Sequence, residues 1–255
     1  MKTNLTAGII TILICLLLPG NILAQSDLSA KEMIKIADEN MEGTSSSSEM
    51  SMSIVRPTWE RTLEFKNWVK GSEYALTLVT APAKEKGQTF LKRGNDMWNY
   101  LPKIGRMIKL PPSMMSQGWM GSDYTNDDVL NETSLTDDYQ HRFTGVATLE
   151  NRECKIIEMI PHEESNIVWG KVVTWVSVKD HLFMKNEYYD EDDYLVRTEI
   201  FQNIQTMGGR LIPTKYVIIP AENPDQKTVV TIKNMKFDVK LNDSFFSQQN
   251  MKKIR

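Results

Sequence analysis

Apolar and polar residues alternate with a period of two through most of the chain, and this alternation constrains the fold more than any other feature. It is clear at Leu63 and Phe65, which flank Glu64, and it returns over 194–204 and 229–234. Short polar turns separate the alternating runs. Such runs predict β-hairpins in an antiparallel sheet. We expect roughly ten or eleven strands, with no βαβ rhythm and no internal repeat.

A helix is predicted near the start of the chain, over residues 29–42. Ser29 and Glu32 have the spacing of a capping box, and the apolar residues behind them recur at helical intervals. Gly43 is expected to end the helix. The serine run 45–48 that follows is predicted to be a loop. The chain is therefore expected to be mainly β, with a few helices.

Residues 111–138 interrupt the strand pattern. Pro111 and Pro112 end the preceding strand, and the Asn-Asp-Asp sequence at 126–128 can cap a short helix. Long structured excursions from a sheet often serve as lids or binding loops. The alternative is a helix that plugs one end of a barrel as part of the core. Both interpretations stay open from the residues alone.

A sheet of this size, with so few helices to cover it, is expected to curl. The concave face of a curled sheet is either filled by its own side chains or left as a ligand cavity. Met114, Met115, Trp119 and Met120 all lie within the excursion. Methionine adapts to varied apolar ligands, so an apolar lid of this kind suits an acyl chain. Ordinary core packing is the simpler explanation of the same residues.

Residues 1–24 have the pattern of a secretory signal peptide. A short basic region precedes an apolar run at 9–18, and a cut is expected after Ala24. The apolar run is too short to span a bilayer as a helix, and an uncleaved anchor is the weaker alternative. Cleavage leaves Cys154 as the only cysteine, so no internal disulfide is expected. We predict an exported chain, in a periplasm or an extracellular space, with one domain over residues 25–255.

Several functional classes do not fit the sequence. The formal net charge is −3, which does not favour binding to nucleic acid. The three histidines are not spaced as zinc ligands, and neither a nucleophile elbow nor a phosphate-binding loop is found. Cys154 lies in an expected strand and is interpreted as a packed thiol. We expect no catalytic residues, no metal and no cofactor.

The acidic residues are interpreted as structural. The run 190–193 is expected to be a hairpin turn, because it lacks the glycine and the spacing of a calcium loop. Asp123, Asp127 and Asp128 are expected to cap a helix or to bond within their loop. No histidine or other ligand set accompanies them, so a catalytic or metal-binding role is disfavoured.

A long motif over residues 96–128 adds a family resemblance. It contains W-x-Y-L-P-x-x-x-R at 98–106 and W-M-G-S-D-Y-T-N-D-D at 119–128. Both segments resemble the outer-membrane lipoprotein-sorting family, a LolA-like group, and the resemblance extends over nearly all of residues 25–255. It implies an incomplete, strongly curved antiparallel β-barrel (a half-barrel) with a helical lid across its mouth. The concave face of such a half-barrel binds lipid.

The resemblance also implies roles for particular residues. Arg106, the motif arginine, is expected either to hold a lid carboxylate such as Asp123 as a latch or to contact a lipid headgroup. None of the residues is expected to be catalytic. The expected lipid contacts of the cavity and lid are Leu63, Phe65, Trp98, Tyr100, Met114, Met115, Trp119 and Met120.

The function implied by the resemblance is that of a periplasmic carrier without turnover. It would bind acyl chains of lipoproteins or lipids and move them toward the outer membrane. Its partners would be an inner-membrane export pump of the resistance-nodulation-division (RND) type and an outer-membrane acceptor. One alternative is a periplasmic domain that senses lipid or lipoprotein without transport. Another is an enzyme on the same half-barrel, which would need a polar catalytic cluster that the sequence does not offer.

Overall fold

The alternating runs fold into one continuous antiparallel sheet of 13 strands. The computed structural model describes residues 28–130, 134–165 and 167–255, and the sheet lies within them. The strands are β1 (Ser45–Arg56), β2 (Trp59–Lys70), β3 (Tyr74–Ala81), β4 (Thr89–Arg93), β5 (Asp96–Leu101), β6 (Arg106–Lys109), β7 (Tyr139–Leu149), β8 (Arg152–Pro161), β9 (Lys171–Ser177), β10 (Phe183–Tyr189), β11 (Leu195–Met207), β12 (Arg210–Pro220) and β13 (Lys227–Phe237). Each strand pairs with its neighbour in sequence, apart from β6 with β7, and β1 also pairs with β13.

The sheet has more strands than the roughly ten or eleven expected from alternation. Residues 89–92 of β4 are all buried, so no alternation marks this strand, and β6 is only four residues long. The serine run 45–48, predicted to be a loop, is instead the start of β1. That prediction was wrong because the run pairs with both β2 and β13, and pairing on both sides outweighs weak local strand preference.

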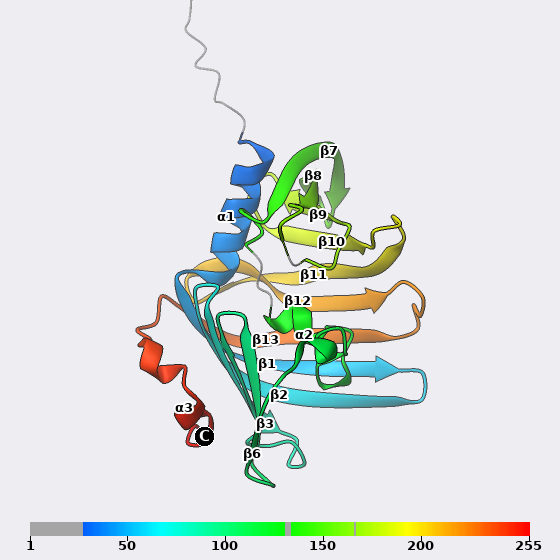
Figure 1. Cartoon of the computed structure of the whole chain (residues 1–255). Coiled ribbons are helices and arrows are strands. Elements are labelled where there is room, and N and C mark those ends of the chain that lie inside the picture. Colours follow the sequence, from blue (N-terminus) through cyan, green and yellow to red (C-terminus); the bar gives the residue numbers. More distant parts are fainter. Residues whose placement is uncertain (1–27, 131–133, 166) are drawn as a thin grey trace, which may run out of the picture.

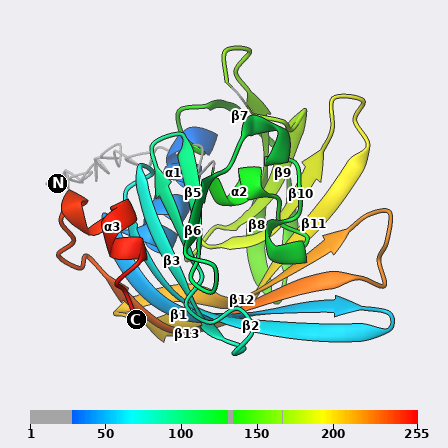
Figure 2. The same cartoon turned by 60° about the horizontal axis from the view of Figure 1, so that its bottom comes forward.

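The sheet bends into an open half-barrel whose two edge strands are β6 and β7, as Figure 2 shows. The described residues between these edges, 110–130 and 134–138, belong to the excursion that the sequence marked at 111–138, and Figure 2 shows its helix within the curve of the sheet. It contains the 3₁₀ turns η1 (Pro112–Met114) and η2 (Trp119–Gly121) and the helix α2 (Asn126–Leu130). The predicted incomplete, curved antiparallel barrel is confirmed.

Two further helices lie on opposite faces of the sheet (Figure 1). The helix α1 (Ala30–Glu42) begins at the capping box of Ser29 and ends at Gly43, where φ is 64°. It packs on the concave face, against β7, β12 and β9. The helix α3 (Gln248–Met251) packs on the other face, against β4. The predicted helix over 29–42 is thus confirmed, apart from its first residue, which is the cap.

The concave face carries two apolar clusters, which meet at Tyr216. The first, the α1 cluster, lies under α1 and contains Ala30, Met33, Ile34, Ala37, Tyr139, Ile157, Met159, Val172, Val176, Phe183 and Phe201. The second, the excursion cluster, lies under the excursion and contains Met52, Ile54, Leu63, Phe65, Val79, Phe90, Met97, Trp119, Ile218 and Val230.

Cys154 is a free thiol on β8, packed with Leu182 and Met184. The interpretation of this residue as a packed thiol is confirmed. No helix within residues 28–130, 134–165 or 167–255 has the length and apolar character needed to cross a membrane. The predicted signal peptide, residues 1–24, lies outside the residues that the structure describes.

Candidate ligand-binding site

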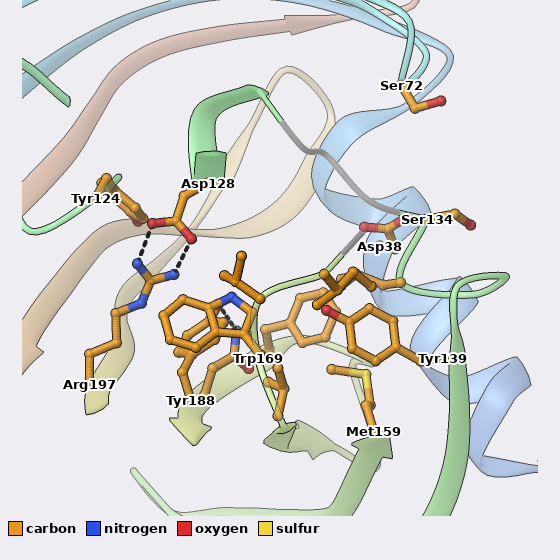
Figure 3. Close-up of a pocket in the computed structure, with 16 residues that line it drawn as sticks. Asp38, Ser72, Tyr124, Asp128, Ser134, Tyr139, Met159, Trp169, Tyr188 and Arg197 are labelled. Atoms are coloured by element: carbon orange, nitrogen blue, oxygen red, sulfur yellow. Dashed lines mark hydrogen bonds and ion pairs between the residues drawn. The ribbon is translucent and has the colours of Figure 1, made fainter. Parts of the chain in front are cut away.

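A cavity of about 390 Å³ lies between α1, α2 and strands β7–β11. This volume falls within the range of small-molecule pockets. Figure 3 shows Trp169 and Tyr188 on one side of the cavity and Tyr139 with Met159 on the other. The apolar and aromatic lining residues are Leu135, Tyr139, Met159, Ile167, Val168, Trp169, Val172 and Phe183, and the polar ones are Asp38, Ser72, Tyr124, Asp128, Ser134, Asn186, Tyr188 and Arg197.

Arg197, on β11, is held in this wall by an ion pair and by aromatic rings. Its guanidinium donates to both carboxylate oxygens of Asp128 on α2, with Nη2 at 2.9 Å from Oδ1. The two side chains are only 6% and 11% exposed. The guanidinium carbon lies 4.1 Å from the ring centre of Tyr188 and 4.8 Å from that of Trp169. Burial alone would lower the pKa of Arg197, but Asp128, Tyr188 and Glu199 together raise it above its usual value, so Arg197 stays charged and ties α2 to the sheet.

Glu199 makes a second tie between the excursion and β11. The hydroxyl of Tyr124, from the excursion, donates to Glu199 Oε1, and the hydroxyl of Tyr188 donates to Oε2 at 3.1 Å. Burial raises the pKa of Glu199. Burial also raises the pKa of Tyr124, so this hydroxyl keeps its proton and remains a donor. The result is a buried polar network at one side of the cavity.

The other end of the excursion is held by β1, β2 and β13. Asp123 accepts hydrogen bonds from Arg56 at 3.0 and 3.1 Å and from the hydroxyl of Thr228 at 2.7 Å. The Arg56 and Asp123 side chains are 13% and 10% exposed. Arg61, on β2, donates to the carbonyl of Met120. Arginines from three strands therefore fix the excursion in the hollow.

The start of α2 explains why Asp128 lies where Arg197 can reach it. The Asp128 carboxylate accepts from the backbone N–H of Thr125 at 2.7 Å, and the Thr125 hydroxyl accepts from the N–H of Asp128 at 3.0 Å. This reciprocal pair is a capping box. The interpretation of Asp128 as a capping residue is confirmed. Asp123 instead bonds to Arg56 and Thr228, outside its own loop, and the side chain of Asp127 is not described. In the described part of the chain, no group of three or more His, Cys, Asp or Glu is placed to hold a metal ion.

Trp119 fills the part of the hollow beside β2–β5. Its side chain is 8% exposed, and its ring centre lies 5.3 Å from those of both Phe65 and Phe90. The buried indole Nε1 has no hydrogen-bond partner among the described residues. An unpaired buried donor costs roughly 1–3 kcal/mol. Apolar packing, rather than a hydrogen bond of the indole, therefore holds Trp119 in place.

Five of the eight predicted lipid contacts come together in the excursion cluster. Leu63, Phe65 and Trp119 are buried there, and Met115 and Met120 pack against them. None of the five lines the cavity of Figure 3. They occupy the neighbouring part of the same hollow, and contact of these residues with a ligand stays a prediction.

Trp98 and Tyr100 lie on the other face of the sheet. They pack against Phe246 and Met251 of the C-terminal segment. The expectation that they line the hollow is wrong, because β5 is apolar on both faces and alternation does not say which face is concave. Met114 is half-buried in η1, and its carbonyl accepts from the side chain of Asn126 at 2.9 Å.

Arg106 does not hold Asp123. It is exposed at the start of β6, where it pairs in register with Leu101, and no ion pair with a described residue involves it. Asp123 pairs instead with Arg56, because the excursion carries Asp123 away from the β5–β6 hairpin to the end of β1. Contact of Arg106 with a lipid headgroup stays a prediction.

The sequence analysis missed the residues that build the cavity wall. In the run 194–204, alternation groups Arg197 and Glu199 with the polar positions, which an antiparallel sheet usually turns to solvent. In the structure these two residues are buried and point inward, in line with Phe201. The sequence did offer one signal that Arg197 and Glu199 face inward, because they share the alternation of Phe201, an apolar residue of the same strand. Trp169 and Tyr188 belong to other elements, and nothing in the sequence indicated that they lie beside Arg197.

The sheet, its hollow and the excursion define the class of protein: a half-barrel with the LolA-like fold. A DUF1329 family protein from Desulfovibrio piger is 26% identical, with a TM-score of 0.78 over 87% of this chain and 97% of that chain. A LolA superfamily protein from Nitrosomonas europaea is 23% identical, with a TM-score of 0.74 over 88% and 99%. A domain from Vibrio parahaemolyticus, proposed to be an outer membrane lipoprotein-sorting protein, is 20% identical, with a TM-score of 0.74 over 88% and 100%.

Residues 71–253 match the model of a protein family described as uncharacterized protein-like, and the chain belongs to this family. A search of curated proteins finds no significant match. The predicted resemblance to the outer-membrane lipoprotein-sorting family is confirmed in the fold.

Proposed function

We propose that this protein is a periplasmic carrier that binds acyl chains of lipoproteins or lipids and moves them toward the outer membrane. The observation that carries the proposal is the cavity of about 390 Å³ on the concave face of the half-barrel, half of whose lining residues are apolar or aromatic. Each buried CH₂ contributes about 0.8 kcal/mol. Burial of an acyl chain in the cavity would therefore supply the binding free energy, and binding would need no catalytic group.

The excursion supports a mechanism for binding and release. Trp119 covers Phe65 and Phe90, and a chain that displaced Trp119 would cover the same rings. A chain that extends from the cavity into the neighbouring excursion cluster would therefore compete with Trp119 for the apolar wall there. The empty and the loaded protein would then each have a stable state. The ion pairs Arg197–Asp128 and Arg56–Asp123 would set how readily the excursion leaves the hollow.

The cargo and partners follow by analogy and from exposed groups. The fold likeness to a LolA superfamily protein and to a domain proposed for lipoprotein sorting supports an acylated cargo. An RND-type export pump in the inner membrane would load the carrier, and an outer-membrane acceptor would unload it. Arg106, exposed and without an ion pair to a described residue, is available to contact a headgroup or one of these partners.

Organic extraction of the freshly purified protein, followed by mass spectrometry, tests the proposal. Acyl-chain compounds are expected in the extract. Val172→Phe, which fills the cavity from the buried wall, should deplete them. Val178→Phe makes the same change at an exposed position outside the lining and should not.

An extract without acyl compounds, together with no binding of added acyl chains, would rule the proposal out. Transfer of a labelled lipoprotein between vesicles separates a carrier from a sensing domain. A carrier accelerates the transfer, whereas a domain that only senses lipid binds the cargo and leaves the transfer rate unchanged.

A further inference from the structure

Asp38 places an unpaired carboxylate in the wall of the cavity. It follows the buried Ala37 on α1, and Figure 3 shows it across the cavity from Arg197. No hydrogen bond or ion pair joins its side chain to another described residue. Burial raises the pKa of Asp38 to about 6, with a further contribution from Glu39. Burial without a partner destabilises the charged form of a carboxylate. A ligand that supplies the missing partner therefore gains affinity.

The other charges of the cavity wall cancel. The positive charge of Arg197 is balanced by the carboxylate of Asp128, which accepts two hydrogen bonds from it. Glu199 lies behind the wall and is acidic, so it does not offset the charge of Asp38. Asp38 therefore leaves the cavity with a negative balance at neutral pH. A carboxylate or phosphate headgroup would meet repulsion here, whereas an ammonium or hydroxyl group would find an acceptor.

Asp38 also lies where a ligand's polar end could reach solvent. A second hollow of about 520 Å³ runs along the outside of α1, and Asp38 and Ser134 line both this hollow and the cavity. The outer hollow is otherwise polar, with Lys31, Lys35 and Asp137 in its wall. An amphiphile with its chain in the cavity would thus carry its head past Asp38.

We propose that the cavity selects an amphiphile whose head is a cation or a neutral hydrogen-bond donor, with Asp38 as the acceptor that recognises it. The apolar chain would lie among Met159, Trp169 and Phe183. This inference rests on the proposed function, because it assigns the headgroup chemistry of the same ligand. It excludes free fatty acids and other amphiphiles whose anionic group would lie at Asp38.

Calorimetric titration of the full-length mature chain with three amphiphiles of one chain length tests the assignment. The ligands are dodecylamine (ammonium), monododecanoylglycerol (hydroxyl) and dodecanoate (carboxylate), each below its micelle concentration. Dodecylamine is expected to bind about tenfold more tightly than dodecanoate, a difference that one neighbouring charge can supply. Asp38→Asn should remove this preference and leave monododecanoylglycerol within about twofold.

Glu39→Gln is the matched control. It removes the same charge from the next residue of α1, but the Glu39 side chain is 65% exposed and lines only the outer hollow, not the cavity. The preference for dodecylamine should therefore persist in this variant. A preference that Glu39→Gln abolishes as strongly as Asp38→Asn would reflect the general charge of α1 and would overturn the proposal.

The remaining outcomes separate this inference from the function on which it rests. Equal binding of dodecylamine and dodecanoate to the unmodified protein would contradict the headgroup assignment and leave the carrier function standing. Binding of none of the three would contradict both. An ammonium head can come from an aminolipid or from the free α-amino group of an acylated polypeptide. Lysophosphatidylethanolamine and a lipopeptide with a free α-amino group distinguish these sources, and the true source should lose more affinity on Asp38→Asn.

Discussion

The guanidinium of Arg197 on β11 and the carboxylate of Asp128 on α2 form a nearly buried ion pair that joins the excursion to the sheet. The carboxylate also caps α2. One side chain therefore determines both where the short helix begins and where it docks. The pair lies at the wall of the cavity, so loosening it changes the site and the excursion together.

Asp128→Asn should lower the free energy of unfolding by about 3 kcal/mol, because it leaves the buried Arg197 without its counter-charge. Urea denaturation measures the loss, and hydrogen exchange should show faster exchange over residues 111–130. Asp243→Asn breaks the exposed pair of Asp243 with Lys70 and should cost less than about 1 kcal/mol. Similar losses in the two variants would contradict a tie through the buried pair.

Trp119→Ala should lower the free energy of unfolding by about 3–5 kcal/mol, since it empties the excursion cluster. If lipid and Trp119 compete for this wall, a saturating acyl ligand should stabilise the variant more than it stabilises the unmodified protein. Thermal melting with and without ligand measures both effects. Trp98→Ala provides the comparison, because Trp98 packs on the other face and its loss should not be recovered by ligand. Equal ligand effects in all three proteins would remove Trp119 from the mechanism.

Asp38→Asn should stabilise the protein at neutral pH. The pKa of Asp38 is raised to about 6 in the folded chain, so folding holds its proton more tightly than the unfolded chain does. The free energy of unfolding is therefore lowered as the pH rises through 6, and the asparagine variant escapes this loss. The gain should be about 1–3 kcal/mol near pH 7.5 and should vanish near pH 4. Denaturation curves at the two pH values measure it, and a gain of the same size at both would contradict the buried, ionised state.

Arg106→Ala should change the free energy of unfolding by less than about 0.5 kcal/mol, because the side chain is exposed and unpaired among the described residues. If Arg106 contacts a headgroup or a partner, transfer of labelled lipoprotein to acceptor vesicles should slow severalfold. Lys103→Ala, in the exposed turn that precedes β6, is the control. If neither substitution alters the transfer rate, the role proposed for Arg106 is contradicted.

Local patterns were sufficient for α1 and for most of the strands. The capping box at Ser29 marks α1, and the alternation and turns mark the strands. These signals arise between residues a few positions apart, so neighbouring side chains decide them. The half-barrel was implied only by the resemblance of the motif at 98–106 and 119–128 to a known family. The serine run 45–48 shows the limit, because its strand exists only through pairing with β2 and β13.

The site itself was decided by contacts between residues far apart in the chain. Arg197 was grouped with the polar positions of its strand, yet it points inward because Asp128, Tyr188 and Trp169 surround it there. Trp98 was predicted to line the cavity, yet it lies on the other face of the sheet, where the C-terminal segment covers it. A period of two sorts side chains into two faces but does not say which face is concave or what covers the other. That depends on how the sheet curls and where the excursion and the termini pack, which only the three-dimensional arrangement settles.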